Sequence, residues 1–355
     1  MYIVLAIIAF GILIIVHEIG HFSAAKLLGV RVNEFAVGMG PKLLKKRGKE
    51  TLYTLRALPF GGFCAMEGEN EGTDDPRSLT AQKRWRRIVI FAAGSAANFI
   101  AAFIIIILIT SDATSFVGTT ITNLADGFPN RGEQGLMPGD TIISINGERL
   151  YYVDDFSMFI QFARNGQVDL VIRRRGEKLT LNAFPLERRE YIIDGKSDLR
   201  YGITFNIIEA TAKEKIRFSV YQALNFVRLI RVSLAQLISG TAGLKDLSGP
   251  VGIVDAMNTI GQNAAQRYGV GEALRNIAFF TAFIGVNLAV MNMLPLPALD
   301  GGRILFVFIT WFIERIIRRR LDPKYEGYIH TTAMVLLFGF MIFILVNDVV
   351  KLIYG

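Results

Sequence analysis

YIVLAIIAFGILIIVHEIGH, residues 2–21, is the stretch of sequence that decides the fold. Its first fifteen residues carry no charge, and the apolar character continues past the histidines to about residue 26. A run of this length lets a helix cross the roughly 30 Å hydrocarbon core of a bilayer. No basic segment precedes the run and no small-residue cleavage site follows it, so we interpret it as a retained span and not as a signal peptide.

The composition fits a membrane protein with a sizeable water-exposed part. Hydrophobic residues make up 52% of the 355 residues and the mean hydropathy is +0.38, which is too apolar for an ordinary soluble enzyme. Charged residues still make up 20%, which excludes a purely buried bundle. The single cysteine, Cys64, cannot form a disulfide within the chain, so an outward-facing part must be held by its own core.

Four apolar runs are long enough to span a membrane: 2–26, 88–110, 276–297 and 329–346. An even number of spans puts both termini on one side. Basic residues crowd the segments between spans one and two and between spans three and four, which makes these segments cytoplasmic and both termini extracytoplasmic. These basic cytoplasmic segments largely account for the net charge of +8, so no nucleic-acid partner is expected. The basic residues are Lys42, Lys45, Lys46, Arg47, Lys49, Lys83, Arg84, Arg86, Arg87, Arg315, Arg318, Arg319, Arg320 and Lys324.

The remaining segments predict smaller structures around these spans. Loose alternation over 31–39 and 51–66 predicts a β-hairpin at the cytoplasmic face, with a basic turn over 41–50. Residues 115–208 predict a β-rich domain, with strands at 141–145, 168–173, 178–183 and 201–205. Residues 211–240 predict an amphipathic helix, either at the outer membrane surface or packed on that domain. The expected domains are therefore 1–114, 115–208, 209–275 and 276–355.

His17, Glu18 and His21 carry the chemistry of the first span. Histidines four residues apart lie on one helix face, where two imidazole nitrogens can bind one zinc ion. A glutamate beside the metal can take a proton from the attacking water and pass it to the leaving amine. Chance matches to this pattern occur in soluble proteins, but ionisable residues in an apolar span are costly unless they are paired, metal-bound or facing water.

A catalytic zinc takes three protein ligands, so one more must come from elsewhere in the chain. The remaining histidine, His330, lies at the mouth of the fourth span, where a structural role is the alternative. Asp300 lies at the inner end of the third span, after Pro295 and Pro297, which should break that helix and let the carboxylate turn inward. By itself Asp300 would be read as the cap of a short helix, but its depth favours it as the third ligand.

The HEIGH pattern of span one, together with Asn292-Met-Leu-Pro-Leu-Pro-Ala-Leu-Asp300-Gly of span three, resembles the site-2 protease family of intramembrane zinc metalloproteases. More narrowly, the chain is similar to the bacterial regulator-of-sigma-E protease type, on the strength of three further segments. They are the PDZ-like run 135–147, the run Leu247-Ser-Gly-Pro-Val-Gly-Ile before span three, and Asn347-Asp348. The segment Tyr201-Gly202-Ile203 is similar to the carboxylate-binding strand of a circularly permuted PDZ domain.

The resemblance implies a four-span α-helical protein of the bacterial cytoplasmic membrane with one extracytoplasmic PDZ domain. It implies that His17, His21 and Asp300 bind zinc, that Glu18 is the general base, and that Asn287 and Asn292 hold the substrate backbone or the oxyanion. Hydrogen bonding between helices is the alternative role of the two asparagines.

The resemblance also implies how substrates are handled. The hairpin, ending near residues 60–66, adds an unwound substrate as a further strand. The substrates are membrane-anchored proteins, such as an anti-sigma factor or a remnant signal peptide, that an earlier cleavage has trimmed. Enterobacterial relatives carry two PDZ domains in tandem, whereas 115–208 has room for one.

Two other functions compete with this interpretation. A catalytically inactive membrane scaffold, whose PDZ domain recruits partners, would be favoured if Glu18 or a ligand were missing, and all are present. A metal transporter would spread ionisable residues along a path across the membrane, whereas here they cluster at one depth.

Overall fold

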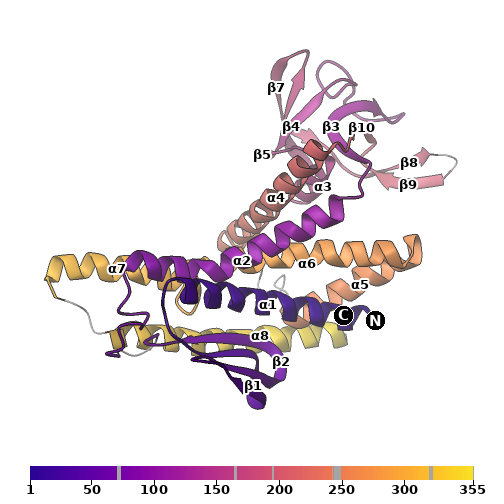
Figure 1. The fold of residues 1–355 in the computed structure, drawn as a ribbon. Helices are drawn as coiled ribbons and strands as arrows, with labels where there is room; N and C mark the ends of the chain where they lie inside the picture. The colour runs from indigo at the N-terminus through magenta and orange to yellow at the C-terminus, as the bar shows by residue number, and fades with distance from the viewer. Residues whose placement is uncertain are drawn as a thin grey trace. The chain divides into compact units, whose positions relative to one another are not determined.

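The computed structural model describes residues 1–69, 73–163, 166–193, 196–241, 243, 249–319 and 323–354 (Figure 1). Its contacts divide the chain into two compact units. The helical unit comprises Met1–Ile109 and Ile230–Gly355, and the β unit comprises Thr110–Leu229.

Within the described residues, four helices are long and apolar enough to cross a membrane. They are α1 (Tyr2–Leu27), α2 (Arg84–Thr110), α6 (Val270–Asn292) and the apolar part of α8 (Pro323–Tyr354), which covers Gly327–Asp348. Each coincides with one of the apolar runs. The third run was predicted to reach residue 297, but its helix ends at Asn292, because prolines at 295 and 297 cannot continue the helical hydrogen bonding.

The first helix packs on one side and is exposed on the other. Its buried face contacts α5 (Pro250–Tyr268) and α6. Large apolar side chains elsewhere on the helix, such as Ile3, Ile8 and Ile12, are about half exposed. An apolar surface of this kind on a spanning helix suits contact with lipid chains. The buried cluster is made of Tyr2, Ala6, Leu13, Met257, Ala264, Ala273, Ile277 and Ile284.

The predicted hairpin forms, but its basic turn was placed wrongly. Strand β1 (Val32–Arg47) continues through the basic residues, and β2 (Leu52–Met66) follows after only four residues. The positive φ angles of Gly38 and Gly40 bend β1 in its middle. Residues 42–47 pair with 52–56, residues 34–37 pair with 52–55, and residues 32–37 also pair with 62–66. The lysines are compatible with a strand because residues 40–47 are exposed.

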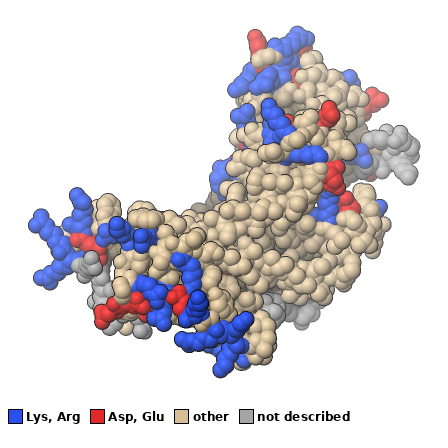
Figure 2. Space-filling model, viewed as in Figure 1, with Lys and Arg blue, Asp and Glu red and all other residues tan. Residues whose placement is uncertain are grey.

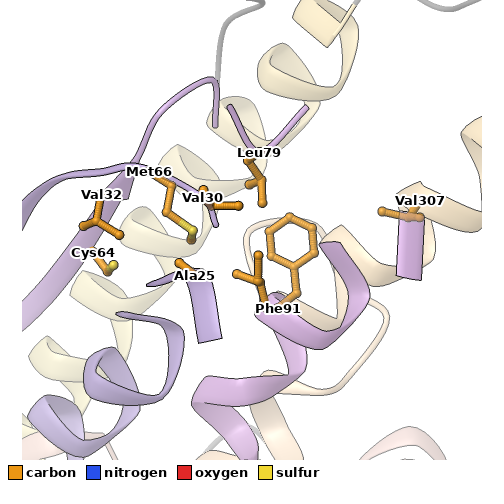
Figure 3. Packing of buried hydrophobic residues seen from close by; sticks show 9 residues of the cluster. Ala25, Val30, Val32, Cys64, Met66, Leu79, Phe91 and Val307 are labelled. Carbon is orange, nitrogen blue, oxygen red and sulfur yellow. The ribbon is translucent and has the colours of Figure 1, made fainter. Parts of the chain in front are cut away.

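A hydrophobic cluster fixes this hairpin to the helices (Figure 3). Figure 3 shows Val32, Cys64 and Met66 of the hairpin close to Ala25 of α1, with Phe91 of α2 nearby. The same burial raises the pKa of the Cys64 thiol well above its usual range. The whole cluster comprises Ala25, Val30, Val32, Cys64, Met66, Leu79, Ile90, Phe91 and Val307.

A further helix, α7 (Asp300–Ile317), occupies the segment that the sequence interpretation left as a cytoplasmic loop. Arg303, Glu314 and Arg315 interrupt its apolar run, so a search for spanning segments passes over it. Its apolar side chains are only partly covered, and Trp311 and Phe312 are 45% and 60% exposed. The segment predicted as interfacial, 209–275, forms two helices, α4 (Ala212–Ile238) and α5. Of the run 247–253, Leu247 and Ser248 lie outside the described residues.

The β unit holds a six-stranded sheet with the order β10-β3-β4-β6-β7, in which β5 pairs with β4. Three of its strands lie where alternation predicted them: β4 (Thr141–Ile145), β6 (Gln167–Arg174) and β7 (Glu177–Pro185). The fourth predicted strand, 201–205, begins two residues later and runs on as β10 (Ile203–Glu209). The other elements are β3 (Ser115–Leu124), β5 (Glu148–Arg149), α3 (Val153–Ile160) and a separate pair, β8 (Arg189–Ile193) and β9 (Lys196–Arg200).

Candidate metal centre

Two histidines of α1 converge on one point. Their Nε2 atoms lie 3.1 Å apart, as expected for residues one helical turn apart on one face. The Nδ1 atom of His21 lies 2.8 Å from the carbonyl oxygen of Ile90 on α2, a contact in which the ring N–H donates. That bond leaves the Nε2 lone pair of His21 free to bind a metal, a common arrangement for histidine ligands.

Asp300 reaches the same point from the far end of the chain. Its Oδ2 atom lies 3.2 Å from Nε2 of His17 and 3.3 Å from Nε2 of His21. Asp300 stands in the first turn of α7, after the N-cap residue Leu299, so the helix also favours its negative charge. The Asp300 carboxylate thus lies beside the two histidines, whereas the alternative role, the cap of a short helix, does not match, because the N-cap is Leu299 and the helix has 18 residues.

The loop before Asp300 folds tightly onto the helix that follows. A Cβ atom added to Gly301 would lie 2.2 Å from the carbonyl oxygen of Met293, and one added to Gly302 would lie 2.0 Å from that of Leu296. No side chain fits at either position without moving the backbone of the loop. The two glycines thus let residues 293–299 pack against the start of α7 and fix where Asp300 emerges.

The second helix leaves room for the imidazoles. A Cβ atom added to Gly94 of α2 would lie 2.4 Å from Nε2 of His21 and 2.7 Å from Cε1 of His17. Any larger residue at this position would occupy the space that the ligand atoms need.

The three side chains fit a zinc ion. In a tetrahedral site with bonds of about 2.0–2.1 Å, neighbouring donor atoms lie about 3.3 Å apart. The donor separations of 3.1, 3.2 and 3.3 Å match that spacing closely. The Oδ2 atom of Asp300 is buried and has no hydrogen-bond partner among the described residues, so its lone pairs are available to a cation. Two imidazoles and one carboxylate are also a donor set that catalytic zinc uses, with the fourth position open.

Glu18 lies beside this ligand set and next to the hairpin. Its side chain is half-buried, and its Cγ atom would lie 3.3 Å from a Cβ atom added to Gly62 of β2. The absence of a side chain at Gly62 lets the strand pass close to the glutamate. Glu18, next to His17 in the chain, therefore lies close to Gly62 of the sheet.

The other predicted site residues do not join the ligand cluster. Asn287 and Asn292 lie in the last two turns of α6, half-buried, and none of the described hydrogen bonds joins them to the three ligands. His330 lies in α8, and its Nδ1 atom is 3.1 Å from the backbone nitrogen of Ala298, whose N–H donates to it. Because that lone pair is taken, the minor possibility that His330 is the third ligand loses support.

Sequence reasoning missed the residues that support the ligands. The run Ala92-Ala-Gly94-Ser-Ala-Ala97 in span two carries a usable signal, because small residues mark close helix approach in membranes. The carbonyl group of Ile90 gives no signal in the sequence, because every residue has a backbone carbonyl. The contact between Ala298 and His330 joins residues 32 positions apart, and nothing in a single sequence predicts that pairing.

Comparison with known proteins gives matches over nearly the full chain. The model of peptidase family M50 matches residues 5–340. A Clostridium perfringens protein named "Putative zinc metalloprotease" is 36% identical over 352 residues, covering 99% of both chains. A protein of the same name from Clostridium acetobutylicum is 35% identical, covering 98% of this chain and 97% of the relative. The "Regulator of sigma-W protease RasP" of Bacillus subtilis is 25% identical, covering 98% and 97%.

The family match covers the histidines, the glutamate and Asp300 within one model. Four apolar helices of spanning length agree with a membrane protein, and the donor set agrees with zinc as the cofactor. The chain belongs to peptidase family M50, the site-2 protease family of zinc metalloproteases.

Proposed function

We propose that this enzyme cleaves single-span membrane proteins within or near their transmembrane segments. One observation carries the proposal: two donor atoms on an apolar helix of spanning length, from His17 and His21, and one from Asp300 of α7 lie within 3.3 Å of one another. His17 lies fifteen residues along α1 from Tyr2, which is about 22 Å of helix and well inside a bilayer core of roughly 30 Å. A peptide bond that reaches this centre must itself lie at membrane depth.

The chemistry follows from the side chains around this point. Zinc, when bound, polarises the scissile carbonyl and activates the attacking water. Glu18 accepts a proton from that water and then delivers it to the nitrogen of the leaving amine, so that the C–N bond breaks and a carboxylic acid and an amine result. His17, His21 and Asp300 act as the ligands, and the bond from His21 to the carbonyl of Ile90 keeps its ring in place.

The hairpin supplies a place for an extended substrate. Residues 62–66 pair with 32–37, and no other pairing partner is described for them. Their other edge can therefore accept a further strand, as an exposed sheet edge does when it binds an extended peptide. Because Gly62 lies against Glu18, a substrate strand added here would pass close to the base. Asn287 and Asn292 are the amides proposed to hold its backbone or to donate to the oxyanion.

The β unit is proposed to be one circularly permuted PDZ domain. Its sheet ends in β10, which follows Tyr201-Gly202 and leaves one edge unpaired among the described strands. The run 135–147 is held by Arg174, which binds the fully buried Asp140 through two hydrogen bonds and also reaches the carbonyl oxygen of Gly135. A buried pair of this kind fixes one loop conformation. The proposed boundaries remain 115–208 for this domain, with 1–114, 209–275 and 276–355 around it.

The charge distribution supports the proposed orientation. In the helical unit, Figure 2 shows Lys and Arg gathered at the left-hand end and along the hairpin below, with a broad, largely uncharged surface to the right of both groups. Both tryptophans, Trp85 in the first turn of α2 and Trp311 in α7, are about half exposed. Arg84 of α2 binds Glu314 of α7 at 2.6 Å, which places the start of one helix beside the end of the other. Tryptophan and basic residues together mark a cytoplasmic membrane interface, so both termini are proposed to be extracytoplasmic, in a bacterial cytoplasmic membrane.

The test separates catalysis from binding. Full-length protein and a purified single-span substrate are reconstituted in liposomes, and cleavage is measured for wild type, Glu18→Gln and Glu177→Gln, a matched control on the exposed strand β7. Glu18→Gln should keep its zinc and lose roughly two to four orders of magnitude in rate, because an amide cannot accept the proton. Near-normal cleavage by Glu18→Gln would refute the mechanism, and failure of wild type to cleave any such substrate would favour the membrane scaffold.

A further inference from the structure

The loop that delivers Asp300 contains an unusual backbone conformation. Ala298, two residues before the ligand, has a φ angle of +77°. A residue with a Cβ atom rarely adopts a left-handed conformation, which glycine adopts freely. Such a conformation persists only where surrounding contacts hold it in place.

One of those contacts comes from the fourth apolar helix. The backbone N–H of Ala298 donates to Nδ1 of His330, with a nitrogen–nitrogen distance of 3.1 Å. His330 is 8% exposed, and its ring meets that of Phe306 edge to face at 5.0 Å between centroids. The donated proton requires a neutral ring at His330 with an unprotonated Nδ1 atom. The imidazole thus acts as a buried acceptor for one particular backbone group.

On the other side, the glycines at 301 and 302 pack against the loop carbonyls, as described above. The loop therefore packs against the start of α7 through Gly301 and Gly302 and is hydrogen-bonded to His330 of α8. Only Leu299 and Asp300 lie between the hydrogen-bonded Ala298 and the closely packed Gly301. The backbone therefore has little freedom to absorb a displacement between these two points. A shift at Ala298 would be passed almost directly to the carboxylate of Asp300.

We propose that His330 is a positioning residue for the zinc site, acting through the backbone of Ala298 to hold Asp300 within reach of the two histidines. The inference rests on the ligand role of Asp300 in the proposed function. Residues that orient metal ligands typically change metal affinity by tenfold to a hundredfold when replaced. His330 itself makes no contact with the ligand atoms in the described structure, so its effect is indirect.

The experiment measures zinc affinity by competition with a chelating dye, using the full-length protein in detergent. His330→Leu removes the acceptor and should raise the zinc dissociation constant at least about tenfold. His330→Asn, whose Oδ1 can take the place of Nδ1, should stay within about threefold of wild type. Ala298→Gly should rescue His330→Leu to within about threefold, because glycine holds a positive φ without an external acceptor.

A packing role is separated by a matched control. Phe306→Leu removes the ring contact but keeps the acceptor, and it should bind zinc like wild type. If Phe306→Leu weakened zinc as much as His330→Leu, or if Ala298→Gly gave no rescue, the inference would be overturned. Unchanged zinc affinity in His330→Leu would overturn it too. Asp300→Ala keeps the two questions apart: retention of zinc in that variant would instead refute the proposed ligand set.

Discussion

Gly94 stands where α2 passes the two histidines, and its lack of a side chain has a measurable consequence. A methyl group there would lie 2.4 Å from Nε2 of His21, so either the ring or the helix must move. Gly94→Ala should raise the zinc dissociation constant at least about tenfold, the scale seen when ligand orientation is disturbed. Gly339→Ala on α8, where a Cβ atom meets nothing within 4 Å, is the control and should bind zinc normally. Normal zinc binding by Gly94→Ala would mean that the ligands sit elsewhere.

Asp155 of the β unit predicts a pH effect on stability. Burial raises its pKa to about 6, although the backbone N–H groups of Tyr151 and Tyr152 donate to it and act in the opposite direction. In the unfolded chain an aspartate has a pKa of about 3.9. Between about pH 4 and 6 the folded protein therefore holds a proton that the unfolded chain has released, and stability falls as the pH rises through this window.

Asp155→Asn removes that titration. Between pH 4 and 6, the unfolding temperature of the full-length variant should fall less, or rise more, than that of wild type. Parallel curves for the two proteins across this range would show that Asp155 titrates normally in the folded state.

At this scale the sequence indicated the proposed catalytic and metal-binding residues more readily than the residues that contact them. His17, Glu18 and His21 are close in sequence and lie in an apolar helix. Ionisable residues in such a helix cost free energy in a membrane, so their presence there indicates a function. Asp300 could be inferred from depth and from the prolines before it. The supporting contacts of Gly94 and His330 depend on how helices pack, and one sequence carries no measure of that.

At the scale of elements, Asp348 joins two helices of the helical unit. Its Oδ2 atom accepts hydrogen bonds from the backbone N–H groups of Gly249 and Gly252, at 2.9 and 3.0 Å, at the start of α5. The aspartate is 3% exposed and caps a helix to which it does not belong. The sequence drew attention to both the 249–253 segment and Asp348, but it gave no reason to pair them.

Asp348→Ala should destabilise the protein by about 1–3 kcal/mol, since one buried and one partly buried N–H group lose their acceptor. Thermal unfolding in detergent measures this, with Asn347→Ala as the neighbouring control, and zinc binding at the remaining folded fraction should be unchanged. A midpoint equal to wild type would show that water replaces the carboxylate.

Elements were predicted well where one pattern dominated. The four long apolar helices and the strands of the β unit have clear apolar runs or alternation. The hairpin turn was wrong because six exposed residues with four lysines or arginines look like a loop, whereas strand pairing of their backbone decides the structure. Helix α7 was missed because its ionisable residues break a run that is otherwise apolar.

At the scale of the whole molecule, topology is the property to test. In a Cys64→Ala background, Lys46→Cys and Arg319→Cys should be protected from a membrane-impermeant thiol reagent added to intact cells. Lys178→Cys on β7 should react. All three side chains that are replaced are exposed in the structure, so protection reports the side of the membrane and not burial. External labelling at Lys46 would invert the model and with it the direction from which substrates approach.

The ligand set also has a consequence for when the enzyme becomes active. His17 and Asp300 are 283 residues apart in the sequence, by subtraction of their numbers. At roughly 5–20 residues per second, a ribosome needs on the order of 15–60 s to travel from one to the other. During that time the histidines are already in the membrane while the carboxylate has not been made, and the helix bearing His330 is made later still. With the proposed ligand set, we expect a nascent chain to be inert beside the many unfinished membrane proteins around it, and proteolysis to begin only when synthesis is nearly complete.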